Sequence, residues 1–421
     1  MTLSGTPSRM RWWVLALAAL AVSSSYYEDD VIGPIADLLH RQRGFSQSQL
    51  GMLNAVISIP NVALALISGV LIDRCGPARV AFWAAAIGVM GAALTAIGTP
   101  YELMVAGRFI FGISEGAIFI ALIATLARWF PRSGIALATA LYLSLARVGS
   151  YAVDTSTAWA HPLYERGWQA PLVLGMAVTI AGLIAAATLY WTDRHRNSLT
   201  VTVTAERVKW RQVLNFDLSY WYILALHVLY AAVFFPFRTT YVIEYFQHAK
   251  GLTLQQAGVA NSWVFFAAIF ATPLFGLIAD RWGSRALMLA IGTLLLPLTF
   301  VVLGLTHLNL WVSTVLMGIS FSLVPAVIWP ATTLLVEPRR LGTALGLITL
   351  IQALGMAASN LAAGRLADWA HAGAQNPAGY AVMLQFFFIL SIAALIAAVL
   401  LWRRETGPKG HGLEAAGSRA A

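Results

Sequence analysis

The segment GVLIDRCG at residues 69–76 returns as GLIADRWG at residues 276–283, 207 positions further along the chain. Four residues keep their spacing, since Gly69, Asp73, Arg74 and Gly76 recur as Gly276, Asp280, Arg281 and Gly283. The match extends upstream, where SQSQLGMLN at 46–54 corresponds to TLQQAGVAN at 253–261. A shared pattern of this length at one fixed offset indicates that the chain consists of two halves built alike.

Each copy of the repeat begins with a helix-start signal. Ser46 stands three residues before Gln49, and Thr253 stands three residues before Gln256, which is the spacing of a capping box. A capping box satisfies backbone N–H groups that the first turn of a helix leaves without partners. We therefore expect a helix to begin at each point and to run to the repeated Asp-Arg pair.

The composition is that of an integral membrane protein. Of the 421 residues, 59% are apolar and 11% are charged, whereas about 25% of a soluble domain is charged. The mean hydropathy is +0.73, and apolar stretches of about 20 residues, long enough to cross a bilayer, follow one another along the chain. The sequence predicts an all-α integral membrane protein with twelve spans, near residues 12–36, 47–71, 79–98, 102–127, 133–158, 169–192, 217–246, 254–279, 286–305, 309–335, 341–364 and 378–402.

The charges are distributed as in a polytopic membrane protein. With the N-terminus in the cytoplasm, 19 of the 27 Lys and Arg residues fall in cytoplasmic segments, as the positive-inside rule requires. The pI near 9.9 thus reflects membrane topology, and no nucleic-acid partner is expected. Cys75 is the only cysteine, and neither an HExxH metal motif nor a GxxxxGK[ST] nucleotide loop occurs in the sequence. We expect no metal, no cofactor and no enzymatic activity.

The repeat and the charge pattern together set the expected domains. These are a cytoplasmic N-terminus at 1–11, a six-helix bundle at 12–193, a central cytoplasmic loop at 194–216, a second six-helix bundle at 217–402, and a cytoplasmic tail at 403–421, disordered from residue 405. The basic residues of the central loop are either solvated or in contact with anionic lipid. A cleaved signal peptide is an alternative for the start of the chain, but the repeat requires that segment as the first span.

Ionisable side chains inside the spans are the main candidates for function, because their insertion into a bilayer is costly. The first span ends in YYEDD at 26–30, whose Glu28 and Asp30 either face a central cavity or lie at the outer interface. The offset of 207 relates position 30 to position 237, directly before Arg238 of the seventh span. One half therefore carries carboxylates where the other carries a guanidinium. Arg147 lies in the middle of the fifth span, and two arginines suit bidentate capture of carboxylates.

Other polar and aromatic side chains in the spans could line the same cavity. Asn261 and Gln352, like Asn54 and Asn360, could bond either substrate or a neighbouring helix. The aromatic candidates for substrate contact are Tyr26, Tyr27, Tyr142, Tyr241 and Trp329. Asp154, His227 and Arg365 are expected to be polar packing or interfacial groups.

The repeated segment resembles the signature loop of the major facilitator superfamily, because it follows the second span and recurs after the eighth. The resemblance implies the fold of that family, two pseudo-symmetric six-helix bundles. It also assigns a part in the conformational switch to Gly69, Asp73, Arg74, Gly76, Arg79, Asp280 and Arg281. A purely topological role for Arg74 and Arg79 is the alternative. Arg108, four residues before Gly112, fits the family's RxxxG pattern, either as a switch residue or as the partner of an acid in the first span.

A narrower resemblance covers the second, fourth and fifth spans. SIPNVALALISGVLIDR at 58–74, GRFIFGISEGA at 107–117, RWF at 128–130 and LSLARVGS at 143–150 are similar to the branch of lysosomal dipeptide uniporters. In that branch, a glutamate of the fourth helix and an arginine of the fifth hold the two termini of a dipeptide. Arg147 stands at the position of that arginine, whereas Glu115 stands one residue early.

The sequence therefore predicts a secondary active or facilitative transporter of a dipeptide or similar zwitterion, working by alternating access. The alternative is a proton-coupled symporter of a sugar acid or monocarboxylate, and a receptor or scaffold is a minor alternative. The expected substrate contacts are Arg147, Arg238, Glu115, Glu28, Asp30, Tyr27, Tyr142, Tyr241, Asn261, Gln352 and Trp329, of which Glu28, Asp30 and Glu115 could carry a coupling proton. The expected partners are a small solute, a proton in the coupled case, and the bilayer. We expect a monomer in a bacterial cytoplasmic (inner) membrane, with both termini cytoplasmic.

Overall fold

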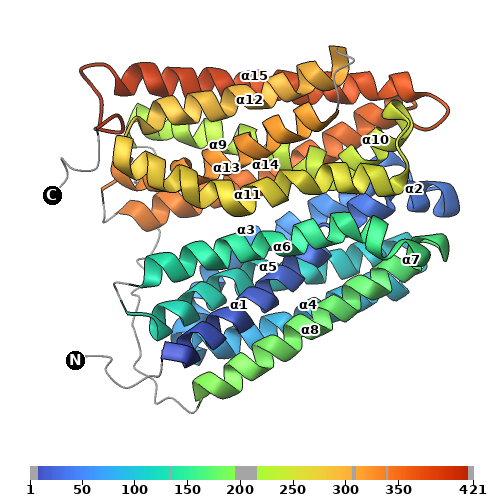
Figure 1. Ribbon diagram of the computed structural model, residues 1–421, viewed down its shortest axis with the longest axis horizontal. Coiled ribbons are helices and arrows are strands. Elements are labelled where there is room, and N and C mark those ends of the chain that lie inside the picture. The colour runs from blue at the N-terminus through green and yellow to red at the C-terminus, as the bar shows by residue number, and fades with distance from the viewer. Residues whose placement is uncertain (1–7, 132–133, 195–215, 306–309, 338–339, 416–421) are drawn as a thin grey trace. The chain divides into compact units, whose positions relative to one another are not determined.

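The structure, a computed structural model, describes residues 8–131, 134–194, 216–305, 310–337 and 340–415. Over these residues the chain folds into long helices joined by short turns, without a β-strand (Figure 1). The central loop predicted at 194–216 lies outside the described residues except for its two ends.

The helices of the first half are α1 (Ser8–Asp29), α2 (Ile32–Arg43), α3 (Gln47–Cys75), α4 (Pro77–Ile97), α5 (Tyr101–Trp129), α6 (Ile135–Trp159), α7 (His161–Glu165) and α8 (Gln169–Arg194). Those of the second half are α9 (Leu218–Pro236), the π-helix η2 (Phe237–Tyr241), α10 (Val242–Lys250), α11 (Leu254–Trp282), α12 (Arg285–Leu305), α13 (Leu310–Leu335), α14 (Leu341–Trp369), the 3₁₀ turn η4 (Pro377–Gly379) and α15 (Tyr380–Glu405). Among the described residues, nine helices are long and apolar enough to cross a membrane. The predicted all-α membrane fold is confirmed.

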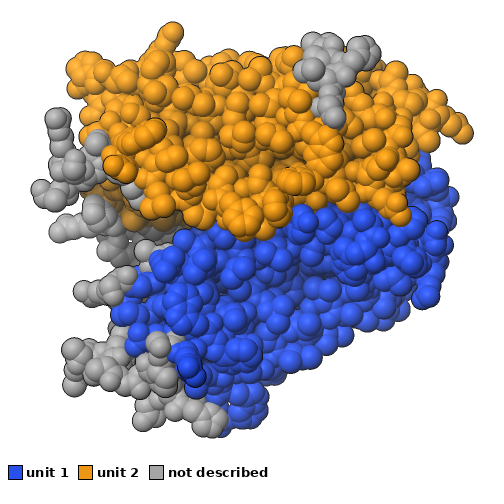
Figure 2. Space-filling view, viewed as in Figure 1, with its two compact units in different colours: residues 1–44, 56–205 blue, residues 45–55, 206–421 orange. Residues whose placement is uncertain are grey.

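The chain divides into two compact units, shown in different colours in Figure 2. Unit 1 comprises residues 1–44 and 56–205, and unit 2 comprises residues 45–55 and 206–421. The start of α3 belongs to unit 2 because the backbone N–H groups of Gln47 and Ser48 donate to the Asp368 carboxylate of α14, at 2.8 and 2.9 Å.

The internal repeat is visible in how the helices of each unit pack. In unit 1, α1 packs against α6 and α8, and α4 packs against α5 and α8. In unit 2, α9 packs against α14 and α15, and α12 packs against α13 and α15. Small residues permit these close contacts: a side chain at Gly149 of α6 would overlap the backbone of Ser23 in α1. The two halves predicted from the sequence therefore share one packing scheme.

Both predicted capping boxes form. The Thr253 side chain accepts from the Gln256 backbone N–H at 3.2 Å, and the Gln256 side chain accepts from the Thr253 N–H at 3.1 Å. Ser46 and Gln49 make the same two bonds, at 3.2 and 2.9 Å. The second and eighth spans thus begin in the same way, which confirms the helix starts expected for the repeat.

The first span is interrupted, although the sequence predicts one continuous span to residue 36. Helix α1 ends at Asp29 and α2 begins at Ile32. Pro34 explains the break, because it has no N–H to donate and its ring clashes with the carbonyl four residues earlier, that of Asp30. The break leaves the last carbonyls of α1 without partners from the next helical turn.

A second proline interrupts the seventh span. Pro236 ends α9, and five residues of π-helix, η2, follow before α10. The carbonyl of Ala232, four residues before Pro236, accepts instead from the Ser359 hydroxyl of α14 at 2.5 Å. A proline ring disrupts the hydrogen-bond ladder of a helix locally, and here the disruption takes the form of a π-helix.

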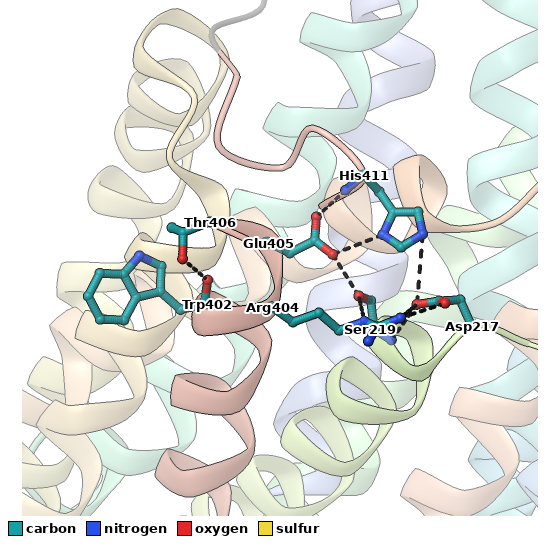
Figure 3. A network of polar contacts seen from close by, with 7 residues as sticks. All are labelled: Asp217, Ser219, Trp402, Arg404, Glu405, Thr406 and His411. Atoms are coloured by element: carbon teal, nitrogen blue, oxygen red, sulfur yellow. Dashed lines mark hydrogen bonds and ion pairs between the residues drawn. The ribbon is translucent and has the colours of Figure 1, made fainter. Parts of the chain in front are cut away.

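The expected disorder from residue 405 onward is wrong for the described part of the tail, which packs against α9 and α15 (Figure 3). Asp217 caps α9 by accepting from the Ser219 backbone N–H at 2.8 Å. Arg404 donates to both carboxylate oxygens of Asp217, at 3.0 and 2.8 Å. His411 donates its backbone N–H to the buried Glu405 carboxylate at 2.7 Å, and its ring lies 3.0 Å from the same group.

The tail then caps a second helix. Leu413 is fully buried, and its carbonyl accepts from the Arg285 backbone N–H at 3.0 Å. The Glu414 carboxylate accepts from the Leu287 N–H, also at 3.0 Å. These bonds occupy N–H groups at the start of α12 that a helix cannot satisfy internally. The polar, Gly- and Ala-rich composition of the tail suggests disorder. The segment is nevertheless ordered, because one buried leucine and one capping carboxylate hold it against α12.

Candidate substrate-binding site

Arg108 of α5 holds the acidic end of α1. Its fully buried guanidinium donates to the carbonyls of Glu28 and Asp29, both at 2.6 Å, and lies 3.9 Å from a Glu28 carboxylate oxygen. The break before α2 removes the usual partners of these carbonyls four residues on, although the Glu28 carbonyl also accepts from the Val31 backbone N–H at 3.4 Å. A cation at a helix C-terminus is favourable. Glu28 and Asp30 are 1% and 3% exposed, so both carboxylates lie inside unit 1 and not at a solvated interface.

Arg147, Tyr26 and Glu115 form a polar cluster from three helices of unit 1. The Arg147 guanidinium of α6 lies over the Tyr26 ring of α1, 5.2 Å from its centroid. Tyr26 lies within electrostatic range of both Arg147 and Glu115. The Glu115 carboxylate of α5 accepts from the Asn61 side chain of α3 at 3.2 Å. A cation, an aromatic hydroxyl and an anion thus occur together, and Arg147 and Glu115 are only partly buried.

Sequence reasoning did not select Asn61. The sequence nonetheless carries a signal for Asn61, since it is a side-chain amide directly after Pro60 in an otherwise apolar span, within a stretch that resembles the dipeptide branch.

Two predicted contacts of unit 1 are more deeply buried. Tyr27 is 3% exposed, and Tyr142 is fully buried with its hydroxyl donating to the Phe119 carbonyl at 3.3 Å.

Arg238 is a deeply buried cation of unit 2. It lies on η2, is 1% exposed, and its guanidinium lies 3.9 Å from the centroid of the Phe265 ring of α11, a cation–π contact. Asn261 donates to the Arg238 carbonyl at 3.4 Å, and the Tyr241 hydroxyl donates to the Asn360 carbonyl at 2.5 Å. Asn261 and Tyr241 therefore hold the backbone around the π-helix that carries this arginine.

The two remaining predicted contacts, Gln352 of α14 and Trp329 of α13, lie around His227 of α9. The His227 Nε2 atom is 2.7 Å from the Gln352 side-chain oxygen. The imidazole meets the Trp329 ring edge to face, with centroids 5.0 Å apart. From the sequence, His227 is expected to be a polar packing or interfacial group. The structure brings it together with two candidates for substrate contact.

The residues predicted to act in the conformational switch lie at the junctions of α3 with α4 and of α11 with α12. Asp73, Arg74, Arg79 and Arg281 are exposed, Gly69 lies within α3, and the side chain of Asp280 is outside the described part of the structure. Gly76 and Gly283 form the turns themselves. Arg108 lies elsewhere, against the end of α1.

Two units of like packing, with charges of both signs inside apolar spans, define the class of polytopic membrane transporters. A family model described as Major Facilitator Superfamily matches residues 18–248 and 223–420. The chain belongs to the major facilitator superfamily, which confirms the resemblance of its signature loop.

Individual relatives agree with this assignment. The lysosomal dipeptide transporter MFSD1 of Homo sapiens is 29% identical over 417 residues, which cover 94% of this chain and 87% of the relative. The probable sulfoacetate transporter SauU of Cupriavidus necator is 22% identical over 307 residues, 68% of this chain and 69% of the relative. A bacterial homologue of the human lysosomal transporter Spinster, in an inward-facing and occupied conformation, shares the fold with a TM-score of 0.73 and 17% identity, over 96% of this chain and 98% of that one.

Proposed function

We propose that this transporter moves a dipeptide or a similar small zwitterion across the membrane by alternating access. The observation that carries the proposal is the Arg147–Tyr26–Glu115 cluster of unit 1, where a cation lies over an aromatic ring and an anion lies within electrostatic range of the same tyrosine. A zwitterion presents a carboxylate and an ammonium, which such a pair can bind at the same time. The similarity to a lysosomal dipeptide transporter supports the same substrate class.

Each charged group has a distinct part in this proposal. Arg147 binds the substrate carboxylate through its planar guanidinium, and Glu115, oriented by Asn61, receives the ammonium. Arg238 provides a second carboxylate-binding cation in unit 2. We assign Glu28 chiefly to the buried pair with Arg108, because that contact already neutralises it.

A proton-coupled organic-anion symporter is the second candidate. It is favoured by the buried carboxylates Glu28 and Asp30, since acids inside spans can carry protons. The similarity to a probable sulfoacetate transporter fits the same alternative. In that case Arg147 of unit 1 or Arg238 of unit 2 would bind the anion, and Glu115 or Asp30 would carry the proton.

The setting of this activity is also part of the proposal. We place the protein as a monomer in a bacterial cytoplasmic membrane, acting by transport without catalysis. The proposed bundles are residues 12–193 and 217–402, with both termini in the cytoplasm, because that orientation places most Lys and Arg residues on the cytoplasmic side.

Counterflow in proteoliposomes tests the substrate class. Vesicles loaded with unlabelled alanylalanine should accumulate the labelled dipeptide through the wild-type protein, and empty vesicles should not. The same vesicles are loaded in parallel with acetate, sulfoacetate or glucarate. Counterflow of the acids alone would contradict the dipeptide proposal and support the symporter. A pH gradient that drives uptake would show proton coupling.

A further inference from the structure

The pair formed by His227 and Gln352 lies well inside its helices. His227 is about 14 Å from the start of α9 and Gln352 about 17 Å from the start of α14, at 1.5 Å of rise per residue. Both side chains are only partly buried, and Trp329 is 38% exposed. Partly exposed polar side chains at this depth of a span cost free energy if they contact lipid. We therefore expect it to face water or a bound solute.

The hydrogen-bonding capacity of the pair is incompletely used. A neutral imidazole has one donor and one acceptor, and a side-chain amide has an NH₂ group and an oxygen. If His227 donates from Nε2 to the amide oxygen, its Nδ1 atom can accept and the Gln352 NH₂ group can donate. If the amide is turned round, the two roles are exchanged. Either arrangement leaves one donor and one acceptor for another molecule.

The contacts recorded around Gln352 favour the first arrangement. The Gln352 nitrogen lies 3.6 Å from the Met356 sulfur, a weak acceptor that a carbonyl oxygen could readily replace. In the turned arrangement the amide oxygen would face that sulfur, which offers no hydrogen to donate. The Gln352 NH₂ group is therefore the available donor and His227 Nδ1 the available acceptor.

We propose that His227 and Gln352 bind the peptide group of the substrate, with Trp329 against the adjoining side chain. A peptide group presents one carbonyl acceptor and one N–H donor, which is the complement of the pair. The proposal rests on the dipeptide function above and goes beyond it, because that function concerns the charged termini of the substrate whereas this pair of unit 2 recognises a peptide group. A solute with the same termini but no peptide group would lose both hydrogen bonds.

Two compounds separate these contributions. Glycylglycine and 5-aminopentanoate have the same charged ends and the same number of chain atoms between them, but only glycylglycine has a peptide group. Isothermal titration of purified wild-type protein should show a preference for glycylglycine of at least about tenfold, since two groups of the site otherwise lose their partners. His227→Phe and Gln352→Leu should reduce the preference to less than about threefold and leave the affinity for 5-aminopentanoate nearly unchanged.

The control is His161→Phe, which changes a histidine of α7 in unit 1 and should keep the full preference. His227→Asn, which retains one donor and one acceptor, guards against misfolding of the phenylalanine variant and should keep part of the preference. An unchanged preference in both His227→Phe and Gln352→Leu would overturn the proposal. Equal binding of the two compounds by wild-type protein would also overturn it, but would leave binding of the termini intact. Binding of neither compound would contradict the dipeptide function as well.

Discussion

Gly76 and Gly283, 207 residues apart, each close a signature segment with a glycine turn of positive φ. Their φ angles are +85° and +71°, and each donates its backbone N–H to the carbonyl four residues earlier, Ile72 at 2.9 Å and Ala279 at 3.0 Å. Positive φ favours glycine, because a Cβ atom would crowd the backbone. The repeat in the sequence is thus also a repeat of positive φ and of this hydrogen bond, although the ψ angles differ, at 143° for Gly76 and −130° for Gly283. The glycines that end the two segments are required by geometry.

The first prediction concerns this turn. Gly76→Ala should lower the free energy of unfolding by about 1–2 kcal/mol, the cost of left-handed backbone for an L-residue. Crowding adds little, because the nearest atom to the new Cβ is an Arg128 side-chain nitrogen at 3.9 Å. Melting temperatures of the purified protein measure the effect. Gly276→Ala is the matched control, since it has open space and ordinary φ, and should be neutral or slightly stabilising. Equal melting temperatures for the two variants would contradict the argument.

Arg108 leads to a second prediction. Arg108→Gln removes the cation that binds the end of α1 and leaves the buried Glu28 carboxylate uncompensated, which costs about 3–5 kcal/mol of stability. Adding Glu28→Gln should restore a part of the loss, because the uncompensated charge is gone. The exposed Arg166 of the same unit provides the control, Arg166→Gln, which should melt like wild type. An Arg108→Gln variant of normal stability but impaired transport would instead favour the switch role that the sequence suggests.

The helical architecture could be predicted because it follows from local signals. Long apolar stretches, capping boxes at Ser46 and Thr253 and the repeated Asp-Arg pair each depend on residues close in sequence. The break in the first span could also have been anticipated, since Pro34 lies within it. The partner of the carbonyls at this break could not be predicted, because it is Arg108, about 80 residues away and on another helix.

The candidate site shows the same limit. Arg147 and Glu115 stand out in the sequence as charges inside spans, and the structure brings both near Tyr26. Asn61 and His227 are single polar residues without a motif, and only their contacts with Glu115 and Gln352 give them meaning. Neutral polar groups inside spans more often serve helix packing than binding, so composition and spacing favour the less specific interpretation.

A third prediction concerns Arg147. Arg147→Lys keeps the positive charge but loses the planar fork that binds a carboxylate through two hydrogen bonds. We expect a dipeptide to bind at least about tenfold more weakly, as one charge-assisted hydrogen bond is lost. Titration of the purified protein with alanylalanine measures the change, and Arg166→Lys serves as the control in the same unit. Unchanged affinity in Arg147→Lys would remove this residue from the site.

The last prediction links the tail network to pH. Burial acts against ionisation of Asp217, but hydrogen bonds from the Ser219 backbone and from Arg404 outweigh it and lower the pKa of the carboxyl below its ordinary value. A carboxyl with a lowered pKa in the folded protein contributes stability above its unfolded pKa, about 3.9, and loses it as the pH falls through the folded value.

Asp217→Asn should therefore destabilise the protein at about pH 5 and above, and the difference from wild type should shrink as the pH falls toward about pH 3. The Asp217 side chain is 37% exposed, so the effect should be about 1 kcal/mol or less. Melting temperatures across this range measure it, with Glu165→Gln, whose carboxyl is 67% exposed, as the control that should change little at any pH. A difference between Asp217→Asn and wild type that persists unchanged at the acidic end would mean that the contribution of Asp217 does not depend on its charge. No difference at any pH would mean that the amide can replace the carboxylate there.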